Sequence, residues 1–174
     1  MLNKLKKSHK GFTIIEVMIV LAIAGLILLI VFLAVPALQR SSRNTQRKND
    51  ASAIGAALAN WISNNNGTVP KKLGKNASSS ILEVCNTGGG ATGGATACTG
   101  NVETATMGFY TDANVSVADG SAGGVTPTPT VNQVVIETGE LCSGNIGGAI
   151  SSRTAAIFYA TESASSASVQ CIEQ

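Results

Sequence analysis

Histidine is nearly missing from this chain of 174 residues, and aromatic residues make up only 4% of it. The single histidine, His9, lies in the first ten residues, so the rest of the chain lacks the base of Ser-His and Cys-His nucleophile pairs. No C-x-x-C pair occurs either, which argues against a Cys/His zinc site. The Gly-rich run at 87–96 lacks the Gly-Lys-[Ser/Thr] ending of a phosphate loop. We therefore expect no enzyme, no metal and no cofactor.

Charged residues are also scarce, at 13% of the chain, and they are unevenly placed. Residues 17–38 carry no charge, whereas four lysines lie in the first ten residues. Beyond those ten, eight basic and ten acidic residues remain, so nothing indicates the basic domain of a nucleic-acid-binding protein. One basic cluster is interpreted as a solvated helix face beside a membrane segment: Arg40, Arg43, Arg47 and Lys48.

The four cysteines all lie in the C-terminal two-thirds of the chain: Cys85, Cys98, Cys142 and Cys171. An even number in an exported domain favours disulfides, whereas four reduced and buried cysteines would fit a cytosolic domain. Three pairings are possible. We favour Cys142 with Cys171 and Cys85 with Cys98, because the second pair would close a short loop in a Gly-rich region that has little core of its own.

A long apolar run follows the basic N-terminal residues. Between Phe12 and Leu38 only Glu16 is charged. As a helix, the uncharged positions 17–38 would span about 33 Å, enough to cross a bilayer core of about 30 Å. A cleaved secretory signal would have a shorter apolar core and a small-residue cleavage site beyond it. The run therefore predicts a transmembrane helix over residues 12–38.

Helical periodicity continues beyond the apolar run. Four apolar residues are spaced so that they share one helix face: Ile54, Leu58, Trp61 and Ile62. Residues 64–67, with the sequence NNNG, predict the end of the helix, because Asn and Gly tolerate the left-handed conformation that is common there. We expect an amphipathic continuation over residues 39–66, whose apolar face needs a packing partner.

The remainder of the chain indicates a loop followed by strands. Residues 67–106 are expected to form a Gly/Ser/Thr-rich loop, with 81–84 as one short ordered element. Residues 107–174 are expected to form an antiparallel sheet, because runs rich in Val, Ile, Phe and Tyr alternate there with Gly, Pro or Ser clusters. The expected strands lie at about 107–111, 114–118, 132–138, 154–161 and 168–173. The sequence thus predicts an α+β fold, in which one long helix packs on a small antiparallel sheet.

Residues 10–20 read KGFTIIEVMIV and follow a basic leader. This stretch resembles the class III signal of type IV pilins and of the related type II secretion pseudopilins. The resemblance implies that prepilin peptidase removes the leader 1–11 by cutting between Gly11 and Phe12, and that the new terminus on Phe12 is N-methylated. It covers about the first 55 residues. Beyond them only the general plan of the pilin fold is similar, with a long helix, a loop, a small sheet and a C-terminal cysteine pair.

Glu16 is the most informative residue, because a carboxylate near the edge of a bilayer helix is costly and is usually kept for a partner. Cleavage would create such a partner in the cationic amino group of Phe12, either within one helix or on a neighbouring subunit. In the second case Glu16 would set the register of subunit assembly. In the alternative interpretation it marks only the interfacial edge of an ordinary membrane anchor.

Helices of this family often lose helicity in the filament between a Gly and a Pro eight residues later. Gly25 fits the first position, but Leu33 occupies the second, and Pro36 follows three residues later. Since Gly weakens a helix and Pro removes one of its hydrogen bonds, we expect a break between Gly25 and Pro36 in the filament.

The resemblance implies a structural subunit that forms a homo-oligomeric helical filament for adhesion, twitching motility or DNA uptake. Its implied partners are prepilin peptidase, membrane lipid before assembly, and an inner-membrane assembly platform with a separate ATPase motor. Basic residues are equally numerous on both sides of the apolar run, so charge does not decide its orientation. The resemblance and the cysteines favour a leader in the cytoplasm, a single-pass precursor in the cytoplasmic membrane and a final place in a cell-surface pilus.

Two other functions remain open at this point. One is a minor pilin or a type II secretion pseudopilin. The other, from a different class, is a signal-anchored surface binding module that never polymerises.

Overall fold

The computed structural model describes residues 11–94, 96–119 and 127–174. The leader residues 1–10, with His9, lie outside the described residues. The chain divides into two compact units, Met1–Gln39 and Arg40–Gln174. The first unit holds the apolar run, and the second holds the strands of the described residues and both cysteine pairs.

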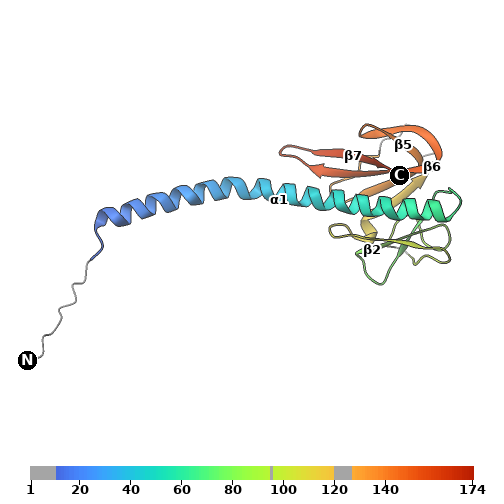
Figure 1. Ribbon diagram of the computed structural model, residues 1–174, viewed down its shortest axis with the longest axis horizontal. Coiled ribbons are helices and arrows are strands. Elements are labelled where there is room, and N and C mark those ends of the chain that lie inside the picture. The colour runs from blue at the N-terminus through green and yellow to red at the C-terminus, as the bar shows by residue number, and fades with distance from the viewer. Residues whose placement is uncertain (1–10, 95, 120–126) are drawn as a thin grey trace, which may run out of the picture. The chain divides into compact units, whose positions relative to one another are not determined.

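Helix α1 spans Ile14–Asn64 and continues through Pro36. Figure 1 shows it as an uninterrupted ribbon that runs from blue to green. Every residue from 11 to 39 is exposed in the single chain, although most of these side chains are large and apolar. Among the described residues, α1 is the one helix whose length and composition would allow it to cross a membrane.

The C-terminal end of α1 forms where the sequence predicts it. Asn66 and Gly67 have positive φ angles of 57° and 77°. The Gly67 amide donates to the Ile62 carbonyl at 2.8 Å, so a carbonyl that would lack a partner at the helix end is satisfied. The chain then turns away from the helix towards the first strand.

The segment after the helix forms a three-stranded antiparallel sheet of β1 (Lys72–Lys75), β2 (Ile81–Cys85) and β3 (Glu103–Thr106). The expectation of a loop over 67–106, with order only at 81–84, is therefore wrong at β1 and β3. The reason is cross-strand burial: Leu73 lies opposite Val84 and Leu82 opposite Ala105, and all four side chains are buried. Packing on one face of the sheet outweighs the low strand propensity of the Lys, Gly and Ala residues around them.

A second sheet has the order β4-β5-β6-β7. Its strands are β4 (Val115–Asp119), β5 (Val134–Ser143), β6 (Ile146–Glu162) and β7 (Ala167–Glu173). These match four of the five predicted strands. β4 pairs with β5 in parallel, whereas the other two pairings are antiparallel, so the prediction of one antiparallel sheet is corrected to two sheets with one parallel pair.

The fifth predicted strand, at 107–111, is wrong, because those residues form a turn that precedes the short 3-10 helix η1 (Asp112–Asn114). Met107 and Tyr110 are buried nevertheless. The apolar pattern there therefore indicates buried side chains and not a paired strand.

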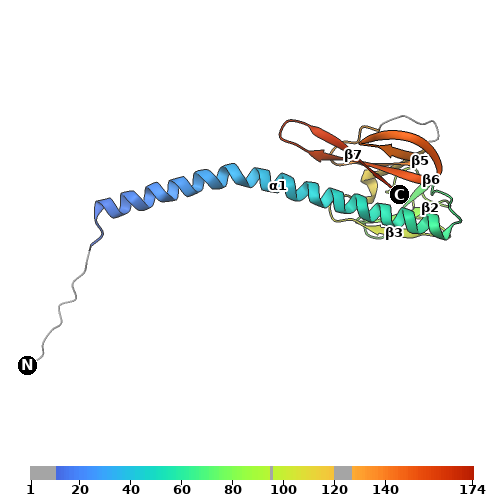
Figure 2. The same cartoon turned by 45° about the horizontal axis from the view of Figure 1, so that its top comes forward.

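One hydrophobic core joins both sheets to the second half of α1, giving the α+β fold that the sequence predicts. Figure 2 shows both sheets beside the same length of the helix. Of the four residues expected on the packing face, Ile54, Leu58 and Trp61 lie in the core at 0%, 0% and 3% exposure, whereas Ile62 is only half-buried and does not belong to the core. The core therefore fixes the helix face on which the sheets rest.

Candidate functional site

The first turn of α1 is closed by a capping box between Thr13 and Glu16. The Glu16 amide donates to Thr13 Oγ1 at 3.3 Å, while the Thr13 amide and hydroxyl donate to Glu16 Oε2 at 2.8 and 2.7 Å. Each residue thus satisfies backbone or side-chain groups of the other. The Thr-x-x-Glu spacing is the sequence signal from which the role of Thr13 could have been predicted.

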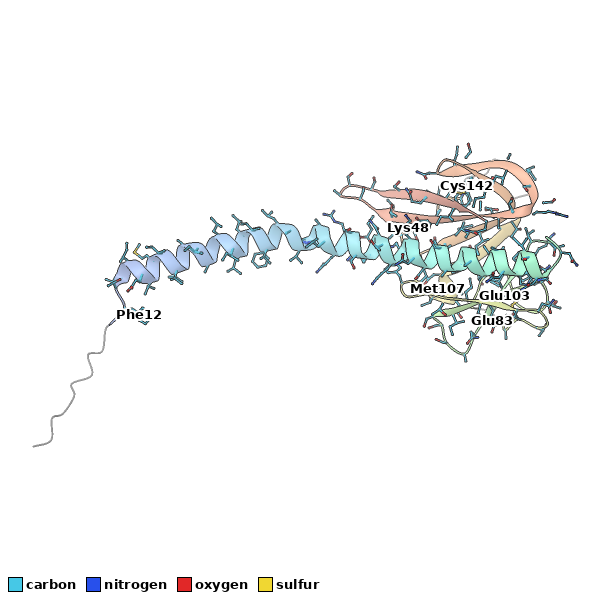
Figure 3. The ribbon with its side chains drawn as sticks, viewed as in Figure 1. Phe12, Lys48, Glu83, Glu103, Met107 and Cys142 are labelled. Atoms are coloured by element: carbon cyan, nitrogen blue, oxygen red, sulfur yellow. A yellow bond between two sulfur atoms is a disulfide. The ribbon has the colours of Figure 1, made fainter. Side chains whose placement is uncertain are left out.

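Gly11 and Phe12 lie just before this cap in non-helical, exposed backbone. Phe12 is 90% exposed, and a Cβ added at Gly11 would meet nothing within 4 Å. No contact within the described residues therefore requires a glycine at position 11. Figure 3 shows Phe12 at the start of the helix.

Glu16 makes its described hydrogen bonds to Thr13 alone. An ionised carboxylate has about four acceptor positions on its two oxygens, and the cap uses two of them through one oxygen. Oε1 remains available for a second donor. The cap therefore holds Glu16 in place without using up its capacity to pair with a cationic group.

The basic cluster after the apolar run is partly buried, which corrects its interpretation as a solvated face. Arg47 is only 1% exposed, and its guanidinium lies 4.4 Å from the centre of the Phe109 ring. Its Nη2 contacts Glu162 Oε1 at 2.5 Å, and Arg43 Nη2 contacts Glu162 Oε2 at 2.6 Å. The two arginines thus bind one carboxylate at the end of β6.

Asn44 strengthens the same junction through the backbone of Glu162. Its Nδ2 donates to the Glu162 carbonyl at 2.7 Å, and its Oδ1 accepts from the Glu162 amide at 2.8 Å. The hydrogen bonds from Arg43 and then Arg47 hold the pKa of Glu162 at about 2, below its ordinary value of 4.5. The carboxylate therefore stays ionised at any physiological pH and fastens the β6–β7 hairpin to α1.

Asp50 anchors the turn at 107–111, one helical turn beyond Arg47. Its two carboxylate oxygens accept from the backbone amides of Gly108, Phe109 and Tyr110 at 2.8, 2.7 and 2.9 Å. The side chain is 5% exposed. Burial also raises the pKa of the adjoining Tyr110 phenol. No spacing in the sequence marks Asp50 for this role, because its partners lie nearly sixty residues away.

Both disulfides join the pairs that the sequence analysis favours. Cys85 at the end of β2 binds Cys98, and Cys142 in β5 binds Cys171 in β7. The first closes the Gly-rich segment over the three-stranded sheet. The second ties the outer part of the β5–β6 hairpin to the last strand, and no free cysteine occurs among the described residues.

Across the described ranges, no group of three or more His, Cys, Asp and Glu residues is placed to hold a metal ion. The buried charged residues Arg47 and Asp50 are occupied by structural contacts. The exposed apolar part of α1 carries the capped carboxylate of Glu16 in its first turn.

Comparison with known proteins identifies the first part of this helix. A family model described as the prokaryotic N-terminal methylation motif matches residues 6–32, which include Gly11, Phe12, Glu16 and Gly25. No curated protein and no solved structure matches the chain. The match covers residues 6–11 of the leader, the cap and most of the apolar run, and so this chain carries the leader signature of the type IV prepilins.

Proposed function

We propose that this chain is the structural subunit of a type IV pilus, polymerised through its apolar helix after cleavage between Gly11 and Phe12. The observation that carries the proposal is the methylation motif at the start of an apolar segment whose residues 11–39 are all exposed in the single chain. A contiguous apolar surface of this size needs lipid or another protein to cover it. In a filament subunit, lipid covers this surface before assembly and neighbouring subunits cover it afterwards.

The physical basis is an exchange of one apolar environment for another. In the membrane, acyl chains cover the residues between Phe12 and Leu38, and in the filament the helices of neighbouring subunits cover them. Because lipid tails are as apolar as the helix surface, the hydrophobic effect contributes little to this transfer. A separate ATPase motor on an inner-membrane platform supplies the drive, and specific contacts must fix the register.

Glu16 supplies the register contact in this proposal. Cleavage by prepilin peptidase frees a cationic amino group on Phe12, whose N-methylation preserves its charge. The free Oε1 of Glu16 on one subunit pairs with the Phe12 terminus of its neighbour, in surroundings of low dielectric constant. An unpaired carboxylate there would be costly, so subunits that arrive out of register are disfavoured.

In the single chain, α1 is continuous past Gly25 and Pro36. In the filament, the helices of neighbouring subunits make additional contacts with it. We place the loss of helicity between these two residues in the assembled state, where crowding of helices favours a locally extended backbone. The precursor lies in the cytoplasmic membrane with its leader in the cytoplasm. The second unit, with its two disulfides, faces the oxidising exterior and becomes the filament surface.

Surface filaments and their composition test the proposal. Filaments sheared from cells that produce the chain should contain it as the main protein, and deletion of its gene should abolish them. A chain that is present in few copies per filament would instead act as a minor pilin or pseudopilin. A chain found only in membranes, in cells whose filaments are unchanged by the deletion, would be a non-polymerising anchor, and the proposal would be wrong.

A further inference from the structure

The segment between β4 and β5 is rich in threonine and proline. Residues 126–130 read TPTPT, and no residue from 120 to 136 is charged. Two of the four prolines of the chain, Pro127 and Pro129, flank Thr128. Segments that combine Ser or Thr with Pro in this way are typical of O-glycosylated surface regions. A residue that accepts a sugar must also be accessible and suitably presented, and the described residues 127–130 meet both conditions.

The two prolines favour extended backbone at Thr128. A proline ring fixes its own φ at about −65°, and it keeps the residue before it out of the α region. Residues 127–130 accordingly form neither helix nor strand. Pro127 and Pro129 also lack the N–H group that a sheet ladder would need. An enzyme that binds its substrate as an extended peptide therefore finds this segment already in shape, at little cost in conformational entropy.

Burial alternates along the segment and directs Thr128 outward. Pro129 is buried, whereas its neighbours Thr128 and Thr130 are both exposed. Successive side chains of an extended chain point to opposite sides, so the contact that buries Pro129 leaves Thr128 facing solvent. The buried proline thus holds the exposed threonine at a fixed place on the surface of the second unit.

The two exposed hydroxyls differ in their contacts. Thr130 Oγ1 donates to Gln133 Oε1 at 3.2 Å, and the Thr130 amide donates to the same oxygen at 3.3 Å. The Gln133 amide in turn donates to the Thr130 carbonyl at 3.0 Å. The Thr128 hydroxyl has no hydrogen-bond partner among the described residues. A transferase can therefore reach Thr128 Oγ1 without breaking any hydrogen bond that this part of the chain makes.

We propose that Thr128 is an O-glycosylation site, whose co-substrate is a sugar activated as a glycosyl diphosphate. A bond forms between Thr128 Oγ1 and the anomeric carbon of the sugar, while the bond from that carbon to the diphosphate oxygen breaks. The diphosphate leaves with the bonding electron pair, and the hydroxyl proton passes to a basic group of the transferase. Because Thr128 belongs to the second unit, the modification does not depend on polymerisation through the apolar helix.

Mass spectrometry of the full chain, purified from the cells that produce it, tests the proposal. A protease that cuts after Glu would release residues 104–137, because no Glu lies between Glu103 and Glu137. We expect this peptide to exceed its sequence mass by one or more sugar residues. Fragmentation that preserves side-chain modifications should place the sugar on Thr128. Thr128→Val keeps a β-branched side chain and removes the acceptor oxygen, so the peptide should lose the added mass completely.

Thr130→Val is the matched control, because it removes the neighbouring exposed hydroxyl and leaves Thr128 in place. Its peptide should carry the same sugar mass as that of the unaltered chain. Non-reducing electrophoresis should show both disulfides formed in the two variants, so that misfolding does not explain a loss of sugar. The proposal is overturned if the peptide 104–137 of the unaltered chain has its bare sequence mass, or if the added mass is a phosphate. It is also overturned if the sugar lies on a residue other than Thr128 or persists in Thr128→Val.

Discussion

Thr13 and Glu16 satisfy each other at the start of α1, with the Thr13 amide 2.8 Å from Glu16 Oε2 and the Glu16 amide 3.3 Å from Thr13 Oγ1. Glu16 therefore has a structural role in the single chain as well as the proposed role in assembly. The two roles place different demands on the side chain. Capping needs an acceptor oxygen, whereas pairing with a cationic terminus needs a negative charge.

Substitutions at these two residues separate the roles. Glu16→Gln keeps the acceptor of a capping box and removes the charge, so we expect normal membrane insertion and loss of filaments. Thr13→Ala removes the cap and keeps the charge, so we expect filaments to form, with some fraying of the first helical turn. Glu16→Leu should behave like Glu16→Gln. The measurement is the amount of chain in the sheared filament fraction relative to the membrane fraction.

The reverse pattern would contradict the register role. If Glu16→Gln assembles normally while Thr13→Ala does not, Glu16 acts through the cap. Non-reducing electrophoresis provides the folding control, because both disulfides of the second unit should form in every variant.

Glu162 should make the free energy of unfolding depend on pH in the acidic range. Its pKa is about 2 in the folded protein and near 4.5 when unfolded, so the stabilisation is complete above about pH 4.5 and is lost as pH falls towards 2. Glu162→Gln should lower the free energy of unfolding at pH 7 by about 1–3 kcal/mol, because Arg47 stays buried without its charged partner. It should also flatten the pH dependence in that window. Denaturant titrations from pH 7 to pH 2 measure both effects.

Glu103→Gln is the control for this experiment, since Glu103 accepts its hydrogen bond from the neutral amide of Asn64. It should keep the free energy of unfolding at pH 7 within about 0.5 kcal/mol of that of the unaltered chain. An unchanged acid dependence in Glu162→Gln would show that other carboxylates cause it.

Asp50 should be among the polar residues of α1 that are least tolerant of change. Asp50→Asn replaces one of two acceptor oxygens by an amide that faces backbone donors, so at least one of the three N–H groups loses its partner. We expect a loss of about 1–3 kcal/mol in the free energy of unfolding. Ser52→Ala, at an exposed position on the same helix, should be within about 0.5 kcal/mol of the unaltered protein. Equal stability of the two variants would refute the anchoring role.

The two disulfides should contribute unequally. Chain entropy predicts about 3 kcal/mol for Cys85–Cys98 and about 3.5 kcal/mol for Cys142–Cys171, whose sequence separations are 13 and 29. The variants Cys85→Ser/Cys98→Ser and Cys142→Ser/Cys171→Ser should therefore both be destabilised, the second somewhat more. Thermal unfolding of the two double variants checks the order. A larger loss from the shorter loop would indicate that packing of the Gly-rich segment dominates.

The sequence predicted the parts of the fold whose signal is local. The periodicity of Ile54, Leu58 and Trp61 located the buried helix face, and the NNNG run located the helix end. The Val- and Ile-rich strands β4 to β7 were also found, although their alternation cannot say that β4 pairs with β5 in parallel. A strand buries the same alternate residues whether its partner strand is parallel or antiparallel.

The errors arose where distant partners decide the structure. Residues 107–111 have the apolar composition of a strand, but the amides of 108 to 110 donate to Asp50 and cannot form a ladder. β1 has the sequence KLGK and became a strand only because Leu73 fits the core opposite Val84. Arg47 is buried because Glu162 and Phe109 meet it from elsewhere in the chain. At the candidate site, the roles of Gly11, Phe12 and Glu16 are predictions from the sequence motif. The cap by Thr13 was missed, although the Thr-x-x-Glu spacing could have predicted it.

The central claim is that the chain is cut between Gly11 and Phe12 and then built into a surface filament. Mass spectrometry of filaments sheared from the cell surface tests it most directly. The account predicts an abundant N-terminal peptide that begins at Phe12 and carries one methyl group on its amino nitrogen. Filaments whose main protein is another chain, or a surface-exposed form of this chain that still carries residues 1–11, would contradict it.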